Sequence, residues 1–215
     1  MSVNDLHECA LPDGAGGVTS YWLRTPTVYD PAKARRLLAR QRVRRPGAHE
    51  FQVASLAGVR ALAEVISDPA EGERQKALLE QWYGLLVPLR EEDIAEPDLE
   101  VRAAELTRLE GERAAAMQQI FSTVSAIEAN LERHWPSYAE LLADRNYWDD
   151  VSRIEIVRLL LVRIGHNGSP GGELPRDDEG LLTGAAYQAI PPEHRVPLAT
   201  FAFALLTPGA SQRKN

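Results

Sequence analysis

Residues 98–136 read DLEVRAAELTRLEGERAAAMQQIFSTVSAIEANLERHWP and contain one glycine and no proline before the last position. Apolar residues recur in this stretch at steps of three, four or seven, which places them on one stripe of a 3.6-residue helix. The stripe consists of Leu106, Leu109, Ala116, Ile120, Val124, Ile127 and Leu131, with Arg113 at the position between Leu109 and Ala116. At about 1.5 Å per residue such a helix is roughly 50 Å long. A helix of this length with one apolar stripe needs a partner, from its own chain or from another.

The residues before this long helix predict one strand and three further helices. Residues 18–23 alternate in polarity and carry two aromatic side chains, which is typical of a short strand. Asp30 followed by proline starts a helix over residues 31–45, which a Pro-Gly pair ends. Two more apolar periodic runs predict helices over residues 49–66 and 70–86.

The residues after the long helix predict four shorter helices. A short helix follows Pro136, residues 146–150 suit a turn, and another helix runs on to Ile164 with Gly165 as its left-handed C-terminal residue. Two final helices are expected over residues 179–189 and 197–206.

These signals predict an all-α fold: a multi-helix bundle with one long central helix and at most one short N-terminal strand. The predicted organisation has four parts. They are a flexible lead (1–17), a helical domain (18–165), a linker loop (166–180) and a C-terminal helical pair with a polar tail (181–215).

Composition favours a soluble cytoplasmic protein. The net charge is -7, and the first thirteen residues lack the basic and apolar regions of a signal peptide. The most apolar segments are too short or too interrupted to cross a bilayer, so no membrane is expected as a partner. Cys9 is the only cysteine, and the five histidines are scattered without metal-ligand spacing. We therefore expect no metal and no cofactor.

The residues also show no catalytic constellation. The acidic runs lie in polar connectors, where nothing suggests the perturbed environment that acid–base catalysis requires. We therefore expect a protein that is not an enzyme, and an enzyme would need a site that only the fold assembles.

The strongest local feature is a basic segment with seven cations in thirteen residues. Together with two aromatic residues of the preceding strand, these cations form the candidate partner-binding set: Tyr21, Trp22, Lys33, Arg35, Arg36, Arg40, Arg42, Arg44 and Arg45. The segment 33–45 could contact the phosphates of a nucleic acid. The opposing interpretation is that it lies against an acidic surface of the same chain or of a partner protein.

A second group of aromatic residues flanks helix ends near prolines and caps. Rings in such positions usually lock helix junctions in the core, and some serve as interface anchors. The group consists of Trp82, Tyr83, Trp135, Tyr138, Tyr147 and Trp148.

Residues 20–66 resemble a pattern in small tail-assembly proteins of tailed phages and prophages. The likeness is carried by YWLRTPTVYD (21–30), by the basic segment with its Pro-Gly turn, and by VASLAGVRAL (53–62). The resemblance covers about a fifth of the chain and assigns no functional residue. It implies a chaperone or structural role around an extended helical partner, such as a tape-measure protein, in the host cytoplasm.

These observations lead to two hypotheses of different classes. The first is a non-enzymatic assembly or chaperone protein that binds protein partners through helical surfaces, with a homo-oligomer as one option. The alternative is a nucleic-acid-binding regulator or packaging protein that uses the basic segment 33–45.

Overall fold

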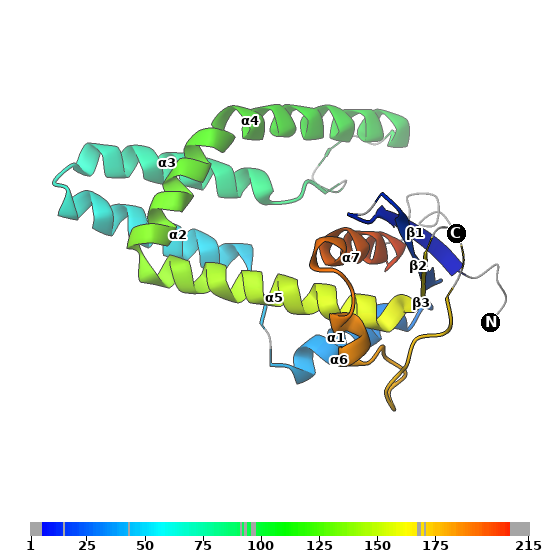
Figure 1. The fold of residues 1–215 in the computed structure, drawn as a ribbon. Coiled ribbons are helices and arrows are strands. Elements are labelled where there is room, and N and C mark those ends of the chain that lie inside the picture. The colour runs from blue at the N-terminus through cyan, green and yellow to red at the C-terminus, as the bar shows by residue number, and fades with distance from the viewer. Residues whose placement is uncertain are drawn as a thin grey trace. The chain divides into compact units, whose positions relative to one another are not determined.

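The computed structural model describes residues 6–14, 16–42, 44–90, 92, 94–95, 98–166, 169 and 171–206. These residues form seven helices and three strands (Figure 1). The strands make one antiparallel sheet, so the chain is a mixed α/β protein and the all-α prediction is wrong. The predicted long helix is confirmed as α4, Leu99–His134. The predicted polar tail from residue 207 onward, and the first five residues of the predicted lead, lie outside the described residues.

The chain divides into two compact units. Unit 1 contains residues 1–44 and 146–215, and unit 2 contains residues 45–145. Unit 1 is therefore assembled from both ends of the sequence. Residues 166–180, the predicted linker, belong to unit 1.

The sheet of unit 1 has the order β1–β2–β3, with β1 Leu6–Pro12, β2 Val18–Arg24 and β3 Leu161–His166. The central strand β2 is the one that the sequence predicts. Its Tyr21 lies opposite Cys9 on β1 and Ile164 on β3. In β1 only Cys9 is buried, so this strand has almost no apolar alternation by which the sequence could reveal it.

The secondary structure predicted for the region after Pro136 is also wrong. The helix α5, Pro136–Leu160, continues through residues 146–150, where the sequence predicts a turn. Burial of Val151 directly after this stretch extends the apolar face of the helix and overrides the weak helix propensity of the polar residues. Residues 161–166 then pair with β2 as a strand instead of ending the helix.

Gly165 has a different role from the predicted helix cap. It lies in β3, where a Cβ atom would be 2.0 Å from the carbonyl oxygen of Ser169 and 2.8 Å from the Trp22 ring. Only glycine allows this close approach of the following loop and the neighbouring strand.

One hydrophobic core holds unit 1 together. It combines β2, β3 and the end of α5 with three helices, α1 (Asp30–Arg40), α6 (Gly184–Gln188) and α7 (Pro192–Leu206). Its fully buried members include Tyr21, Leu23, Leu161, Leu182 and Leu198.

Unit 2 is formed by α2 (Ala48–Val65), α3 (Pro69–Leu86), α4 and the start of α5. The caps that the sequence predicts are present: the Asp68 carboxylate accepts from the Glu71 amide at 3.1 Å, and Asp98 accepts from the Glu100 amide at 2.8 Å. Helices α2 and α3 pack very closely, because a Cβ at Gly72 would lie 2.5 Å from the Ala63 methyl group. The core of unit 2 contains Phe51, Val59, Leu79, Tyr83, Val124, Ile127, Leu131 and Tyr138.

Candidate partner-binding surfaces

The basic segment is helical over a shorter range than the sequence predicts. Helix α1 ends at Arg40, and the two following amides bond back to helix carbonyls. Arg42 has a φ of 55°, the left-handed conformation that closes many helix ends. Arg44 and Arg45 lie beyond the helix, and the boundary between the units falls between them. The seven cations therefore do not share one helix face.

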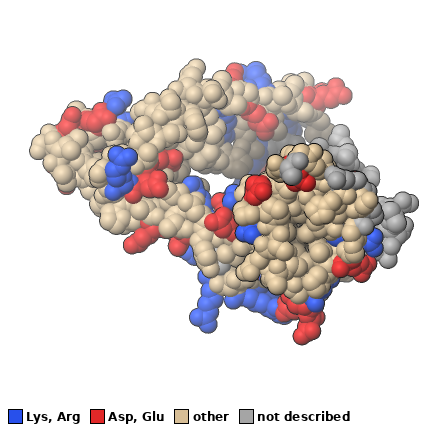
Figure 2. All heavy atoms as spheres, in the orientation of Figure 1, with Lys and Arg blue, Asp and Glu red and all other residues tan. Residues whose placement is uncertain are grey.

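The cations of α1 meet an acidic residue of their own unit. The Lys33 ammonium donates to the Glu179 carbonyl at 2.8 Å, and the Arg40 guanidinium pairs with the Glu179 carboxylate at 2.5 Å. Arg35 and Arg36 are exposed, and a pocket of about 400 Å³ lies beside Arg36. Figure 2 shows Lys and Arg side chains gathered over α1 with Asp and Glu side chains next to them.

The two aromatic candidates of β2 belong to the interior of unit 1. Tyr21 is fully buried, and its hydroxyl lies 2.7 Å from Nδ1 of His194. Nε2 of His194 lies 2.9 Å from the Pro12 carbonyl, which can only accept, so Nε2 carries the proton and Nδ1 accepts from Tyr21. Burial, with smaller contributions from nearby acidic groups, raises the pKa of Tyr21 to about 12. Trp22 is half-buried.

Three residues of the stretch YWLRTPTVYD (21–30) form a polar clamp. The guanidinium of Arg24 binds both carboxylate oxygens of Asp30, each at 2.7 Å. Thr27 donates its amide and its hydroxyl to the same carboxylate at 2.5 and 2.9 Å. Burial alone would raise the pKa of Asp30, but the bonds from Arg24 and Thr27 outweigh it and hold the pKa at about 2. The clamp joins the end of β2 to the start of α1, so these residues have a structural role.

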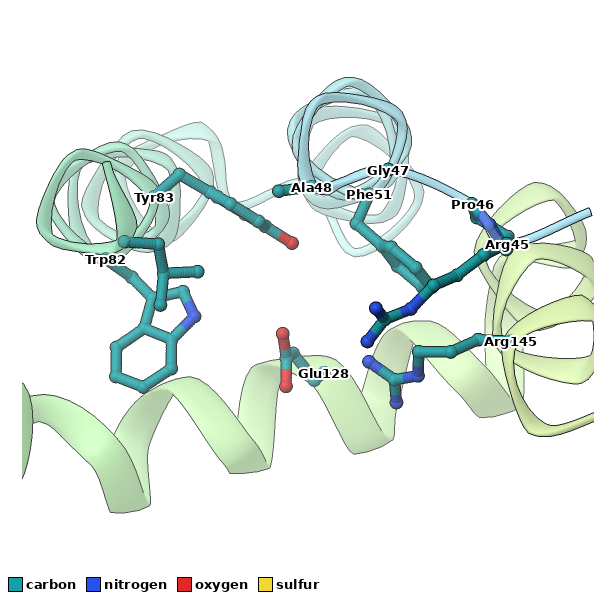
Figure 3. Close-up of a pocket in the computed structure, with 10 residues that line it drawn as sticks. Arg45, Pro46, Gly47, Ala48, Phe51, Trp82, Tyr83, Glu128 and Arg145 are labelled. Atoms are coloured by element: carbon teal, nitrogen blue, oxygen red, sulfur yellow. The ribbon is translucent and has the colours of Figure 1, made fainter. Parts of the chain in front are cut away.

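Unit 2 contains a pocket that the sequence analysis misses. We call it the Arg45–Arg145 pocket; it has a volume of about 530 Å³ and lies between the start of α2, the end of α3, α4 and α5. Figure 3 shows the guanidinium groups of Arg45 and Arg145 on one side, the indole of Trp82 on the other and the Glu128 carboxylate between them. The sequence offers one usable signal, because Arg145 follows Tyr138 by seven residues and so shares its helix face.

The side chains of this pocket are held in place by their neighbours. The Arg145 guanidinium stacks on the Phe51 ring at 4.9 Å from the ring centroid. The Tyr138 hydroxyl donates to Glu128, and burial together with this carboxylate raises the pKa of Tyr138 well above its usual range. Trp82 packs against Phe121 with ring centroids 6.2 Å apart.

Burial along α4 is uneven. Val124, Ile127 and Leu131 are buried near its C-terminal end, whereas Leu106 and Leu109 are half-buried. At the N-terminal end of the helix, the Leu99 side chain is 72% exposed.

Arg113 explains the break in the apolar stripe. Its Nη2 donates to the carbonyl groups of Gly84, Leu85 and Val87 at 2.9, 2.8 and 2.5 Å. These carbonyls belong to the C-terminal end of α3, where the helix leaves them without internal partners. A cation at this end also interacts favourably with the helix dipole. Arg113 therefore fixes the N-terminal half of α4 against the end of α3.

No group of three or more His, Cys, Asp or Glu side chains among the described residues could hold a metal ion. No helix within the described ranges is long and apolar enough to cross a membrane.

Comparison with known proteins gives no match to a family model, to a curated protein or to a solved structure.

Proposed function

We propose that the protein is a non-catalytic assembly or chaperone protein that binds another protein through exposed apolar side chains of α4. The proposal rests on the uneven burial along this helix: Ile127 and Leu131 lie in the core, while the apolar side chains of Leu99 and Phe121 are 72% and 56% exposed. An amphipathic helix that is covered along only part of its apolar stripe is suited to packing against a partner helix.

The hydrogen bonds of Arg113 support this proposal. They hold the outer half of α4 in a fixed position against α3, so binding a partner would order little additional chain. A docking helix that is already rigid loses less conformational entropy on association than one that folds on binding.

The resemblance of residues 20–66 to tail-assembly proteins indicates the class of partner. We propose an extended helical virion protein of the tape-measure type as the partner, and a phage or prophage origin with a role in the host cytoplasm. Within the resembling stretch, Arg24, Thr27 and Asp30 form a structural clamp, so recognition of the partner is assigned to α4 instead.

Site-specific photo-crosslinking tests the proposal. A photoreactive phenylalanine analogue is placed at Leu99 or Phe121, and matched controls carry it at Arg108 or Gln119, which are exposed and which the helical period puts on the opposite face of α4. In a lysate of the organism that encodes the chain, we expect one protein to be crosslinked from positions 99 and 121 and not from 108 or 119.

The protein crosslinked in this way is then purified and its affinity is measured directly. Leu99→Glu and Phe121→Glu should each weaken its binding at least about tenfold. Leu99→Glu should leave the melting temperature unchanged, because its side chain is exposed in the free protein, whereas Phe121→Glu should lower it slightly through lost packing on Trp82. Equal crosslinking from both faces of α4, or unchanged affinity of the two variants, would reject the docking surface. Sedimentation velocity of the parent and of Leu99→Glu tests self-association through the same surface.

The alternative proposal, a nucleic-acid-binding role for α1, has one observation in its favour: Arg35 and Arg36 are exposed on that helix. The contacts of Lys33 and Arg40 with Glu179 weigh against it, because they bring a carboxylate to the face that would meet phosphates.

A further inference from the structure

We propose that the Arg45–Arg145 pocket of unit 2 binds a short peptide segment in which a carboxylate lies next to an aromatic or large aliphatic side chain. This inference rests on the proposed function, since it names the kind of chain segment that a protein-binding molecule would recognise at a second site. The residues that line it do not include Leu99 or Phe121 of the α4 docking surface, and Phe121 contributes only by packing behind Trp82.

The first argument comes from the Arg145 guanidinium. The Phe51 ring lies beneath the guanidinium carbon and helps to position the group. Among the described residues this guanidinium has no hydrogen-bond partner, and it lines the pocket, so its N–H donors are available there (Figure 3). A positioned guanidinium with available donors can bind a carboxylate through two parallel hydrogen bonds.

The second argument comes from the charge of the pocket. The charged residues that line the pocket are Arg45, Glu128 and Arg145, and the Tyr138 hydroxyl donates to the Glu128 carboxylate. Cations outnumber acids in this lining, which favours an anionic ligand. A phosphate group would bring up to two negative charges close to the Glu128 carboxylate, and like charges at such a distance repel. The pocket therefore favours a carboxylate over a phosphate.

The third argument comes from the opposite wall. The half-buried Trp82 and the buried Tyr83 line it, and the Trp82 ring is supported from behind by Phe121. Their rings offer an apolar surface across the pocket from the arginines, as Figure 3 shows. Trp, Tyr and Arg are the residue types that dominate binding hot spots, and the volume of about 530 Å³ lies within the range of small-ligand pockets.

Fluorescence anisotropy with the full chain and labelled peptides tests the proposal. Three probes have an amidated C-terminus: Gly-Ser-Glu-Phe-Ser-Gly and its counterparts with Gln-Phe or Glu-Gly in place of Glu-Phe. The fourth probe has a free C-terminal carboxylate, ends in Ser-Gly-Phe and has no acidic side chain. We expect the Glu-Phe peptide to bind at least about tenfold more tightly than the Gln-Phe and Glu-Gly peptides. The last probe shows whether the carboxylate comes from a side chain or from a chain terminus, because tighter binding of the free terminus assigns the pocket to C-terminal segments.

Variants of the chain establish where the peptide binds. Arg145→Gln should reduce binding of the Glu-Phe peptide at least about tenfold, whereas Arg133→Gln, an exposed arginine on α4 of the same unit, should leave it unchanged. Glu128→Gln keeps an acceptor for Tyr138 and removes the negative charge, so it should tighten binding about threefold or more. An unfolded variant cannot produce this gain, so the outcome does not depend on whether Arg145→Gln folds normally.

Three results would overturn the proposal: equal binding of the Glu-Phe and Gln-Phe peptides, unchanged binding by Arg145→Gln, or stronger binding of inorganic phosphate or ATP than of the peptide at equal ionic strength. Each of them leaves the crosslinking from positions 99 and 121 unaffected. Conversely, peptide binding without crosslinking would reject the α4 surface and keep the pocket.

Discussion

The contacts that stabilise unit 1 internally differ in kind from those that stabilise unit 2. In unit 1, polar side chains meet across long separations in the sequence: His194 binds Tyr21 and Pro12, and Arg158 joins Glu155 on its own helix to Asp177 in a distant loop. In unit 2 most ion pairs join residues three or four positions apart on one exposed helix face, where they contribute little.

This difference indicates which contacts contribute most to the stability of each unit. Unit 2 depends on the apolar faces of its helices and on the caps at their ends. Unit 1 adds buried polar clamps to its apolar core, and a clamp that loses one partner leaves the other group buried without compensation.

The largest effect is expected from a charge in the core of unit 2. Ile127→Asp places a carboxylate at a site that is 6% exposed and should lower the free energy of unfolding by at least about 4 kcal/mol. Thermal unfolding measures the loss, and hydrogen exchange should show that the amides of α2, α3 and α4 are the ones that lose protection.

The matched control is Leu99→Glu, a charge on the same stripe at a site that is 72% exposed. It should change the free energy of unfolding by less than about 0.5 kcal/mol. If Ile127→Asp keeps the melting temperature of the parent, α4 is not part of a core.

The second prediction breaks the polar clamp of unit 1. Asp30→Asn removes the charge partner of Arg24, whose side chain is only 17% exposed, and should cost about 3 kcal/mol at pH 7. Urea unfolding measures the loss. The control Asp150→Asn, which removes an exposed partner of Arg153, should change stability by less than about 0.5 kcal/mol.

The same variant tests whether the contribution of the clamp to stability depends on pH. The pKa of Asp30 is about 2 in the folded chain, below the ordinary value of 3.8 for an aspartate, so its contribution is present above about pH 4 and is lost as the pH falls toward 2. The difference in stability between the parent and Asp30→Asn should therefore shrink over this interval. A difference that stays constant from pH 7 to pH 2 would contradict the ionic clamp.

A third prediction concerns the position of the outer half of α4. Arg113→Gln removes a charged donor from three carbonyls at the end of α3 and should cost about 1–3 kcal/mol. Hydrogen exchange should increase in the N-terminal half of α4 and little elsewhere. Arg108→Gln, which loses only exposed pairs within the same helix, is the control and should leave exchange unchanged. Equal exchange in both variants would mean that Arg113 does not fix this half of the helix.

The contrast between the units also explains which parts of the fold could be predicted from the sequence. The helices of unit 2 follow from local signals, because Asp68 and Asp98 cap helices whose apolar residues repeat with a helical period. The sheet could not be predicted in this way. β1 buries only Cys9, and β3 follows α5 without a turn residue, so both strands are defined by pairing with β2.

The candidate sites follow the same rule. The sequence shows the density of cations in α1 but not Glu179, which meets them from a position far along the chain. Apart from the spacing of Tyr138 and Arg145, it gives no sign of the Arg45–Arg145 pocket, because the lining residues come from four helices and the segment before α2. Composition can indicate that arginines and aromatic residues are present, and only the fold shows which of them converge.

The smallest effect on stability is expected at the basic face of unit 1, where Glu179→Gln breaks the pair with Arg40. Both side chains are 49% exposed, so the free energy of unfolding should change by less than about 0.5 kcal/mol.

The Glu179→Gln variant is also the most sensitive probe of the nucleic-acid alternative, because it removes the carboxylate that lies among the α1 cations. If α1 contacted phosphates, Glu179→Gln would bind DNA more tightly than the parent, and Arg36→Ala would bind it more weakly, with a steep dependence on salt. We expect instead that neither the parent nor Glu179→Gln retards DNA at about 0.15 M salt, since the net charge of -7 opposes a polyanion. Retardation that increases with Glu179→Gln and disappears with Arg36→Ala would favour the nucleic-acid role over protein binding.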